Sequence, residues 1–172
     1  MPRARTLSDY ERGWVSGIID GEGSINVVWH LRTRGRLRKN GTRAPINLLN
    51  YPRPSMRLTV TNTNHSLLEE FQEITGVGTI HNKKSKRALL KRQGYTYQTS
   101  QHSQIKGILS QIRLIAKEDI RKLSLELIEL KALYSGNGHG TDPCIKEKAK
   151  SVADKICDLN RRSIIQRGGQ EL

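Results

Sequence analysis

Cysteine, aromatic residues and long apolar stretches are all scarce in this chain of 172 residues. The two cysteines, Cys144 and Cys157, form no C-x-x-C pair, which excludes a disulfide scaffold and a cysteine zinc site. Their spacing on or near one predicted helix is typical of core thiols. No apolar run is long enough for a membrane span, and no apolar stretch near Met1 indicates a signal peptide. We therefore expect an intracellular protein that is not secreted and has no membrane partner, located in the cytoplasm, the nucleoid or an organelle.

Acidic residues are scarce in the middle of the chain. Residues 23–117 hold 17 of the 30 Lys and Arg residues but only three of the 16 Asp and Glu residues, so the whole net charge of +14 falls within this window. Such segregation predicts one positive face and a polyanionic partner, and nucleic acid is the leading candidate. Aromatic residues amount to 5%, too few for the base-stacking surface of a general RNA-binding protein.

Residue patterns predict the order of helices and strands. Ser8 and Glu11 form a capping box, which predicts a helix that begins after Ser8 and ends among the glycines and acids of positions 20–23. Alternation of apolar and polar residues then predicts strands, and apolar residues at helical spacing predict helices. The predicted strands cover 24–32, 56–61, 79–83 and 95–100, with a turn at 40–41 and a basic loop at 84–92, and the further helices cover 67–74, 105–112, 120–134 and 143–159.

This order predicts an α+β fold in a single domain covering residues 1–172. Its core spans about residues 8–134, and a C-terminal helical extension covers 142–162. One face of an antiparallel sheet is expected to pack on helices, because each strand has one apolar side. The other face is polar and basic, and a ribbon of this kind fits the major groove of DNA.

The segment Val15–Gly23 reads as apolar, small, Gly, two apolar, acid, small, acid, Gly. It resembles the LAGLIDADG motif of homing endonucleases, of the type with a single motif per chain. The strand end at 60–64, the glycines at 76–78 and the segment 114–117 are also similar to that family. The resemblance covers about residues 8–134. It implies the αββαββα fold, with an antiparallel sheet that forms a DNA-binding saddle backed by helices and with extra C-terminal helices.

The resemblance also implies catalytic roles. Glu22, together with the carbonyl of Gly21, would hold Mg²⁺, for which Mn²⁺ would substitute, whereas Ca²⁺ would support binding without cleavage. Lys117 matches a lysine near the scissile phosphate, and Asn62 matches a polar residue at the end of the strand that feeds the active site. The alternatives are that Lys117 is a solvated lysine and that Asn62 is a turn residue.

A small-residue face on the first helix predicts a homodimer. Gly13, Ser16, Gly17 and Asp20 recur at three- and four-residue spacing, so a second helix can approach closely. Because the motif occurs once, we expect the second helix to come from another copy of the chain. The two Glu22 carboxylates would then lie close together and require a divalent cation. The alternative is that the glycine face packs inside the chain.

Polar side chains on the outward parity of the strands are the predicted DNA contacts. Arginine can bind guanine and asparagine or glutamine can bind adenine, whereas arginines in loops contact phosphates. For any single position, the alternative is a solvated surface residue. The predicted set is Ser24, Asn26, His30, Arg32, Arg34, Arg36, Arg38, Arg57, Thr59, Thr61, His81, Lys83 and Gln98.

The predicted function is that of a homodimeric homing endonuclease. It would bind a long, nearly palindromic site in double-stranded DNA and hydrolyse one phosphodiester on each strand with Mg²⁺, leaving short 3′ overhangs. The alternatives are a maturase that binds intron RNA and a DNA-binding relative that does not cleave.

Overall fold

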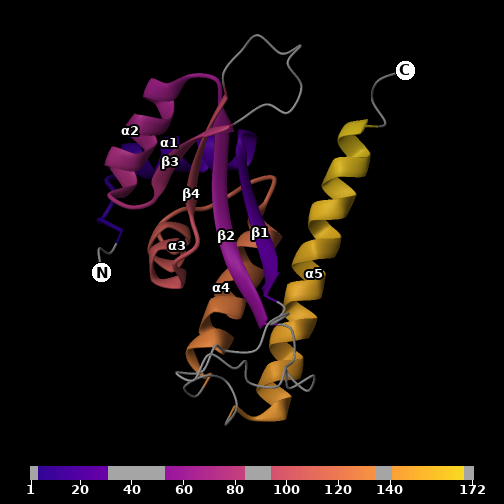
Figure 1. The fold of residues 1–172 in the computed structure, drawn as a ribbon. Helices are drawn as coiled ribbons and strands as arrows, with labels where there is room; N and C mark the ends of the chain where they lie inside the picture. Colours follow the sequence, from indigo (N-terminus) through magenta and orange to yellow (C-terminus); the bar gives the residue numbers. More distant parts are fainter. Residues whose placement is uncertain (1–3, 31–52, 84–93, 135–140, 169–172) are drawn as a thin grey trace, which may run out of the picture.

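In a computed structural model, the order of helices and strands is the predicted one (Figure 1). The structure describes residues 4–30, 53–83, 94–134 and 141–168, and for His30, Lys83 and residues 163–168 only the backbone. The elements are α1 (Asp9–Gly21), β1 (Gly23–His30), β2 (Arg53–Asn62), α2 (His65–Thr75), β3 (Thr79–Lys83), β4 (Gly94–Thr99), α3 (His102–Leu109), α4 (Glu118–Ala132) and α5 (Pro143–Gly168). Arg32, Arg34, Arg36 and Arg38, the turn at 40–41 and the loop at 84–92 lie outside the described residues.

The described strands form one antiparallel sheet in the order β1-β2-β4-β3. Burial along β2 alternates from residue to residue, with Met56, Leu58 and Val60 buried. Ile25 lies opposite Leu58 in the register, and Tyr97 lies opposite Val60. Because these side chains share one parity, they form a single apolar face, which packs with α1, α2 and α3 into one hydrophobic core. The α+β fold with a helix-backed sheet is therefore confirmed.

Local signals define the helix ends. The capping box of α1 is present, since the Ser8 side chain accepts from the Glu11 amide and the Glu11 carboxylate accepts from the Ser8 amide. Helix α2 ends at Gly76, whose φ of 68° is the left-handed conformation that favours glycine. Asp142 caps α5, because its carboxylate accepts from the amide of Cys144 at 2.8 Å.

Helix α5 lies beside the sheet at the edge formed by β1 (Figure 1). Its buried residues Ala149, Val152, Ala153 and Ile156 belong to the same core as the sheet. Cys144 is exposed, so the prediction of a core thiol is wrong there, because the first turn of α5 lies outside that core. Within the described ranges, no helix combines the length and the apolarity that a membrane crossing needs.

Candidate functional site

The junction between α1 and β1 presents Glu22. This residue is exposed and follows the last residue of α1, and its backbone N–H donates to the Ile18 carbonyl at 2.9 Å. The next residue must be glycine, because a Cβ on Gly23 would lie 2.6 Å from the Ile19 carbonyl oxygen. The helix therefore passes directly into the strand, and the Glu22 carboxylate stands at the turn between them.

Lys117 stabilises this turn from the loop before α4. Its Nζ donates to the carbonyl oxygens of Ile19, Asp20 and Gly23, at 2.7, 2.5 and 2.9 Å. An ammonium group has three donors, and its positive charge is attracted to the negative, C-terminal end of the α1 dipole. These bonds place Lys117 at the Glu22 turn, as a residue that holds the main chain there.

Asp20 joins the same loop to α1. Its carboxylate accepts from the backbone amides of Ile115 at 2.6 Å and Lys117 at 3.1 Å. Glu118 then begins α4, where hydrogen bonds from the Arg121 guanidinium, and secondarily from the Leu114 amide, lower its pKa to about 2. The loop 114–118 is therefore tied to both helices through carboxylates.

Asn62 lies at the end of β2, and its contact is local. Its Oδ1 accepts from the amide of Asn64 at 2.8 Å, and Asn64 in turn caps α2. This geometry is that of a turn residue and supports that alternative. Its part in catalysis stays a prediction.

The glycine face of α1 is open. A Cβ added at Gly13, Gly17 or Gly21 would meet no atom within 4 Å, so these glycines are not explained by contacts within the described chain. A hollow of about 600 Å³ runs along this face, lined by Arg12, Gly13, Ser16, Gly17, Asp20, Ser110, Gln111, Ile112, Arg113 and Ile115. Ile115 is 94% exposed at its rim. Among the described residues, no internal packing partner covers these glycines.

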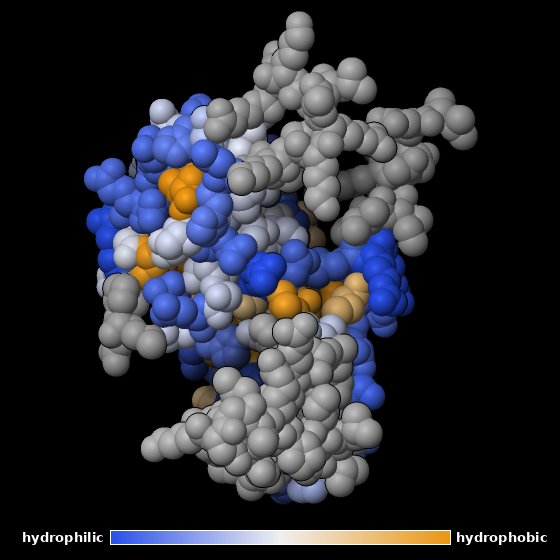
Figure 2. Space-filling model, in the orientation of Figure 1, coloured by the Kyte–Doolittle hydropathy of each residue, from blue (hydrophilic) through white to orange (hydrophobic). Residues whose placement is uncertain are grey.

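The side chains on the outward face of the sheet form polar rows that run across the strands. In the register, Ser24, Thr59, Gln98 and Thr79 make one row, Asn26 and Arg57 a second, and Thr61, Thr96 and His81 a third. Ser24 and Asn26 are hydrogen-bonded to each other at 2.7 Å, and Thr61 and Thr96 at 3.2 Å. The Nε of Arg57 is buried without a hydrogen-bond partner among the residues that the structure describes. The surface seen in Figure 2 is largely hydrophilic, and its apolar side chains are confined to small separate spots.

Comparison with known proteins identifies the family. A family model described as LAGLIDADG endonuclease matches residues 15–126, more than half of the chain. The chain belongs to the LAGLIDADG endonuclease family. The match includes the α1–β1 junction, the polar rows and the Lys117 loop. A search of curated proteins gives no match.

Solved structures share the LAGLIDADG fold of this chain. The homing endonuclease I-CvuI, in complex with the I-CreI target and Mg with the DNA not cleaved, has a TM-score of 0.62 and 22% identity over 87% of this chain and 82% of that chain. The archaeal intron-encoded homing endonuclease I-Vdi141I, complexed with DNA, has a TM-score of 0.63 and 17% identity over 88% and 84%. I-SmaMI bound to cleaved DNA has a TM-score of 0.56 and 21% identity over 88% and 44%.

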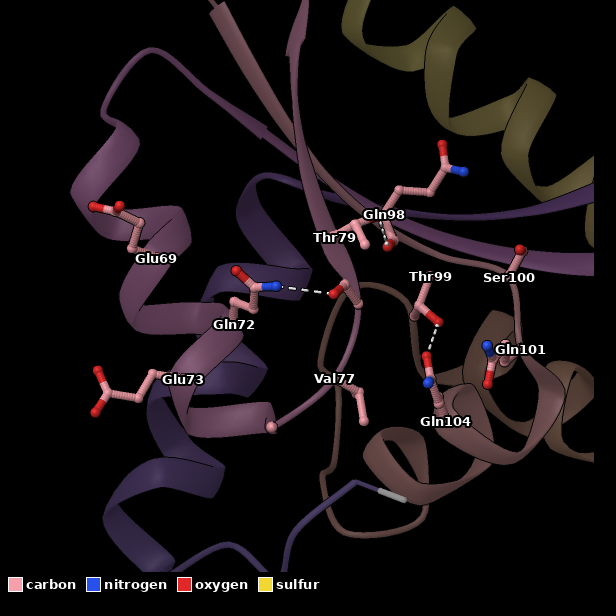
Figure 3. A pocket seen from close by; sticks show the side chains of 12 residues that line it. Glu69, Gln72, Glu73, Val77, Thr79, Gln98, Thr99, Ser100, Gln101 and Gln104 are labelled. Atoms are coloured by element: carbon pink, nitrogen blue, oxygen red, sulfur yellow. Dashed lines mark hydrogen bonds between the residues drawn. The ribbon is translucent and has the colours of Figure 1, made fainter. Parts of the chain in front are cut away.

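A second hollow, of about 610 Å³, lies away from the LAGLIDADG motif, between α2, the sheet and α3 (Figure 3). Gln72 donates to the Gly78 carbonyl and Thr99 to Gln104, so these polar groups are already hydrogen-bonded. Figure 3 shows the carboxylates of Glu69 and Glu73 on the outer side of α2. Within the described residues, no three His, Cys, Asp or Glu side chains gather as a metal site, here or elsewhere.

The residues predicted from the sequence do not include several that the structure places on the polar rows or beside the open face of α1. Thr79 and Thr96 join the polar rows; both lie on the outward side of their strands, but their neighbours across the sheet follow only from the strand register. Ile115 stands exposed beside the open face of α1, although an isoleucine in a chain this polar is ordinarily expected in the core. No local pattern marks Ile115 as an exposed position.

Proposed function

We propose that this protein is a homodimeric, Mg²⁺-dependent endonuclease that cleaves both strands of a long, nearly palindromic DNA site and leaves short 3′ overhangs. The observation that carries the proposal is the open glycine face of α1, which ends at the exposed Glu22. Membership of the LAGLIDADG endonuclease family supports it, and so do similar proteins whose structures contain DNA.

The dimer forms by packing of α1 against α1 of a second copy. Gly13, Ser16 and Gly17 allow close approach, and Asp20 lies on the same face with its carboxylate bonded to the loop below. Ile115 offers an apolar side chain to the partner, which removes it from water. In a two-fold arrangement, this contact brings the two Glu22 residues together near the axis.

The groups at the α1–β1 junction suit a hard divalent cation. The Glu22 carboxylate and the Gly21 carbonyl supply oxygen ligands, and the three carbonyls that bind Lys117 do not include that of Gly21. One carboxylate per chain is too few, so the partner's motif and phosphate oxygens of the DNA complete the site. Bound Mg²⁺ would stabilise charge on the scissile phosphate and lower the pKa of a water molecule. We expect Mn²⁺ to substitute and Ca²⁺ to support binding without cleavage.

Lys117 and Asn62 act around this centre. Lys117 holds the turn that presents Glu22 and adds positive charge beside the phosphate. Asn62 shapes the end of β2, from which its amide is proposed to face the active site.

The polar rows form the DNA-binding surface. Asn26, Arg57 and Gln98 have the side chains that discriminate bases, at about 1–3 kcal/mol for each good pair of bonds. Ser24, His30, Thr59, Thr61, His81 and Lys83 are proposed to contact DNA from the same parity, and Arg32, Arg34, Arg36 and Arg38 from the segment after β1.

The test is selection of cleaved sites from a random duplex DNA pool in the presence of Mg²⁺. The proposal expects long sites with two-fold symmetry and cut ends. Salt-sensitive binding of duplex without any cleavage would refute the catalytic proposal and make intron RNA the next ligand to measure.

Glu22→Gln should abolish cleavage while DNA binding persists, because the change removes the ligand charge but keeps the side-chain shape. Glu70→Gln, on the exposed surface of α2, is the matched control and should cleave at the wild-type rate. Cleavage is followed on the selected duplex, and binding is followed in Ca²⁺. If Glu22→Gln cleaves this duplex at the wild-type rate, the active site lies elsewhere.

A further inference from the structure

The C-terminal helix reaches the polar face of the sheet through one side chain. The Nδ2 of Asn160, on α5, donates to the Ile25 carbonyl at 2.9 Å and to the Asn26 Oδ1 at 3.4 Å. Asn26 donates in turn from its own Nδ2 to the Ser24 Oγ at 2.7 Å. Three polar side chains from two distant parts of the chain therefore form one hydrogen-bonded series.

Helix packing holds Asn160 in this place. Val152, Ala153 and Ile156 are buried in the core, and Leu159 packs partly buried against it. Figure 1 shows α5 running alongside β1, which is the edge strand of the described sheet. The donor that meets Asn26 is therefore carried by a helix anchored independently of DNA.

These bonds define which way the Asn26 amide faces. A side-chain amide has two N–H donors and two acceptor sites on its oxygen. Asn160 occupies one acceptor site of Asn26, and Ser24 occupies one of its donors. Among the described residues, one donor and one acceptor of Asn26 have no partner, and these are the two groups that pair with N7 and N6 of adenine. A reversed amide would exchange them.

We propose that Asn160 is a positioning residue that orients the Asn26 amide for base recognition. The C-terminal helix thereby sets the base preference at one position in each half of the DNA site. This inference rests on the proposed function, because it requires that Asn26 faces DNA. Arg57 lies opposite Asn26 in the register, so the same level of the sheet carries a second base-reading side chain.

The experiment measures the base preference at every position of the selected duplex for wild-type protein and for variants. Asn26→Ala first identifies the position that Asn26 reads. Asn160→Ala should reduce discrimination at that same position by about two- to tenfold, the effect expected of one hydrogen bond, and leave other positions unchanged. In the Asn26→Ala background, Asn160→Ala should have no further effect there.

Asn160→Asp gives a sharper test with nearly unchanged side-chain shape. A carboxylate can donate neither to the Ile25 carbonyl nor to the Asn26 Oδ1 and can only accept from Asn26. The Asn26 amide should therefore turn over, and the preferred base should change rather than weaken. This variant also serves if Asn160→Ala fails to fold. Leu159→Ala is the matched control, because it loosens the packing of α5 without removing the bond to Asn26.

The outcomes separate the two proposals. If wild-type protein enriches no duplex site, the proposed function and this inference are both overturned. If wild type enriches a site but the Asn160 variants keep its preference at the Asn26 position, the inference alone is overturned. The same holds if Leu159→Ala shifts the preference as Asn160→Ala does, since the effect would then belong to helix docking.

Discussion

Replacing Gly17 by leucine should separate the stability of one chain from that of the dimer. A Cβ at this position meets nothing within 4 Å in the described chain, so leucine adds no clash there. Glycine inside a helix is less favourable than leucine by about 0.5–1 kcal/mol, and the monomer should gain about that amount.

The dimer should respond in the opposite direction. In the proposed dimer, two leucine side chains, one from each copy, would stand where the α1 helices approach each other most closely. Overpacking costs about 1–3 kcal/mol per site, hence about 2–6 kcal/mol for the pair. That cost corresponds to an increase of the dimer dissociation constant by about 30-fold at the lower limit and about 20,000-fold at the upper limit.

Sedimentation velocity measures the dimer, and chemical unfolding of dilute protein measures the monomer. Gly107→Ala is a control that should affect the monomer and not the dimer, because its Cβ would lie 2.8 Å from the Ala4 Cβ within the same chain. It should lower the free energy of unfolding and leave association unchanged. Either of two results would refute the reasoning about the open face. One is a Gly17→Leu protein with the dimer dissociation constant of the wild type, and the other is a Gly17→Leu monomer that unfolds more easily than the wild-type monomer.

Three further changes test the α1–β1 junction and its supports. Gly23→Ala should destabilise the fold by about 1–3 kcal/mol in urea unfolding, because its Cβ meets the backbone of Ile19; unchanged stability would contradict the close junction. Lys117→Met should cost about 2–4 kcal/mol through three lost charge-assisted hydrogen bonds, measured by the same method, with Lys122→Met on exposed α4 surface as control. Glu118 has a folded pKa of about 2, below its ordinary value of 4.5, so its contribution to stability should be complete above that ordinary value and lost as pH falls toward 2. Comparing melting temperatures against pH for wild type and Glu118→Gln checks this, since the variant should lack that part of the acid dependence.

Much of the local structure could be predicted from short-range patterns. The capping box at Ser8 and the glycines at 76–78 mark helix ends, because the groups that cap a helix lie within a few residues of its terminus. Alternation identified the buried side of β2, since successive side chains of a strand point to opposite faces. The polar parity follows from the same alternation, whereas the small-residue face of α1 follows from the helical spacing of three and four residues.

The contacts of the site could not be predicted in this way. Lys117 bonds carbonyls that lie more than ninety positions earlier, and Asn160 bonds a residue 134 positions earlier. Asn62 suited both a catalytic and a turn role, and only its bond to the Asn64 amide supports the turn. Such partners depend on how the elements pack, which no local period encodes.

The sequence by itself determined the motif, the helical and strand periods and the confinement of the net positive charge to one region. These properties depend on residue identity and on spacing within a few positions. Only the tertiary structure decided that the glycine face of α1 is open, that Lys117 supports the Glu22 turn and that α5 reaches Asn26. The physical reason is that burial and long-range hydrogen bonds are set by the register of the sheet and the docking of helices, where each element is positioned by all its neighbours together.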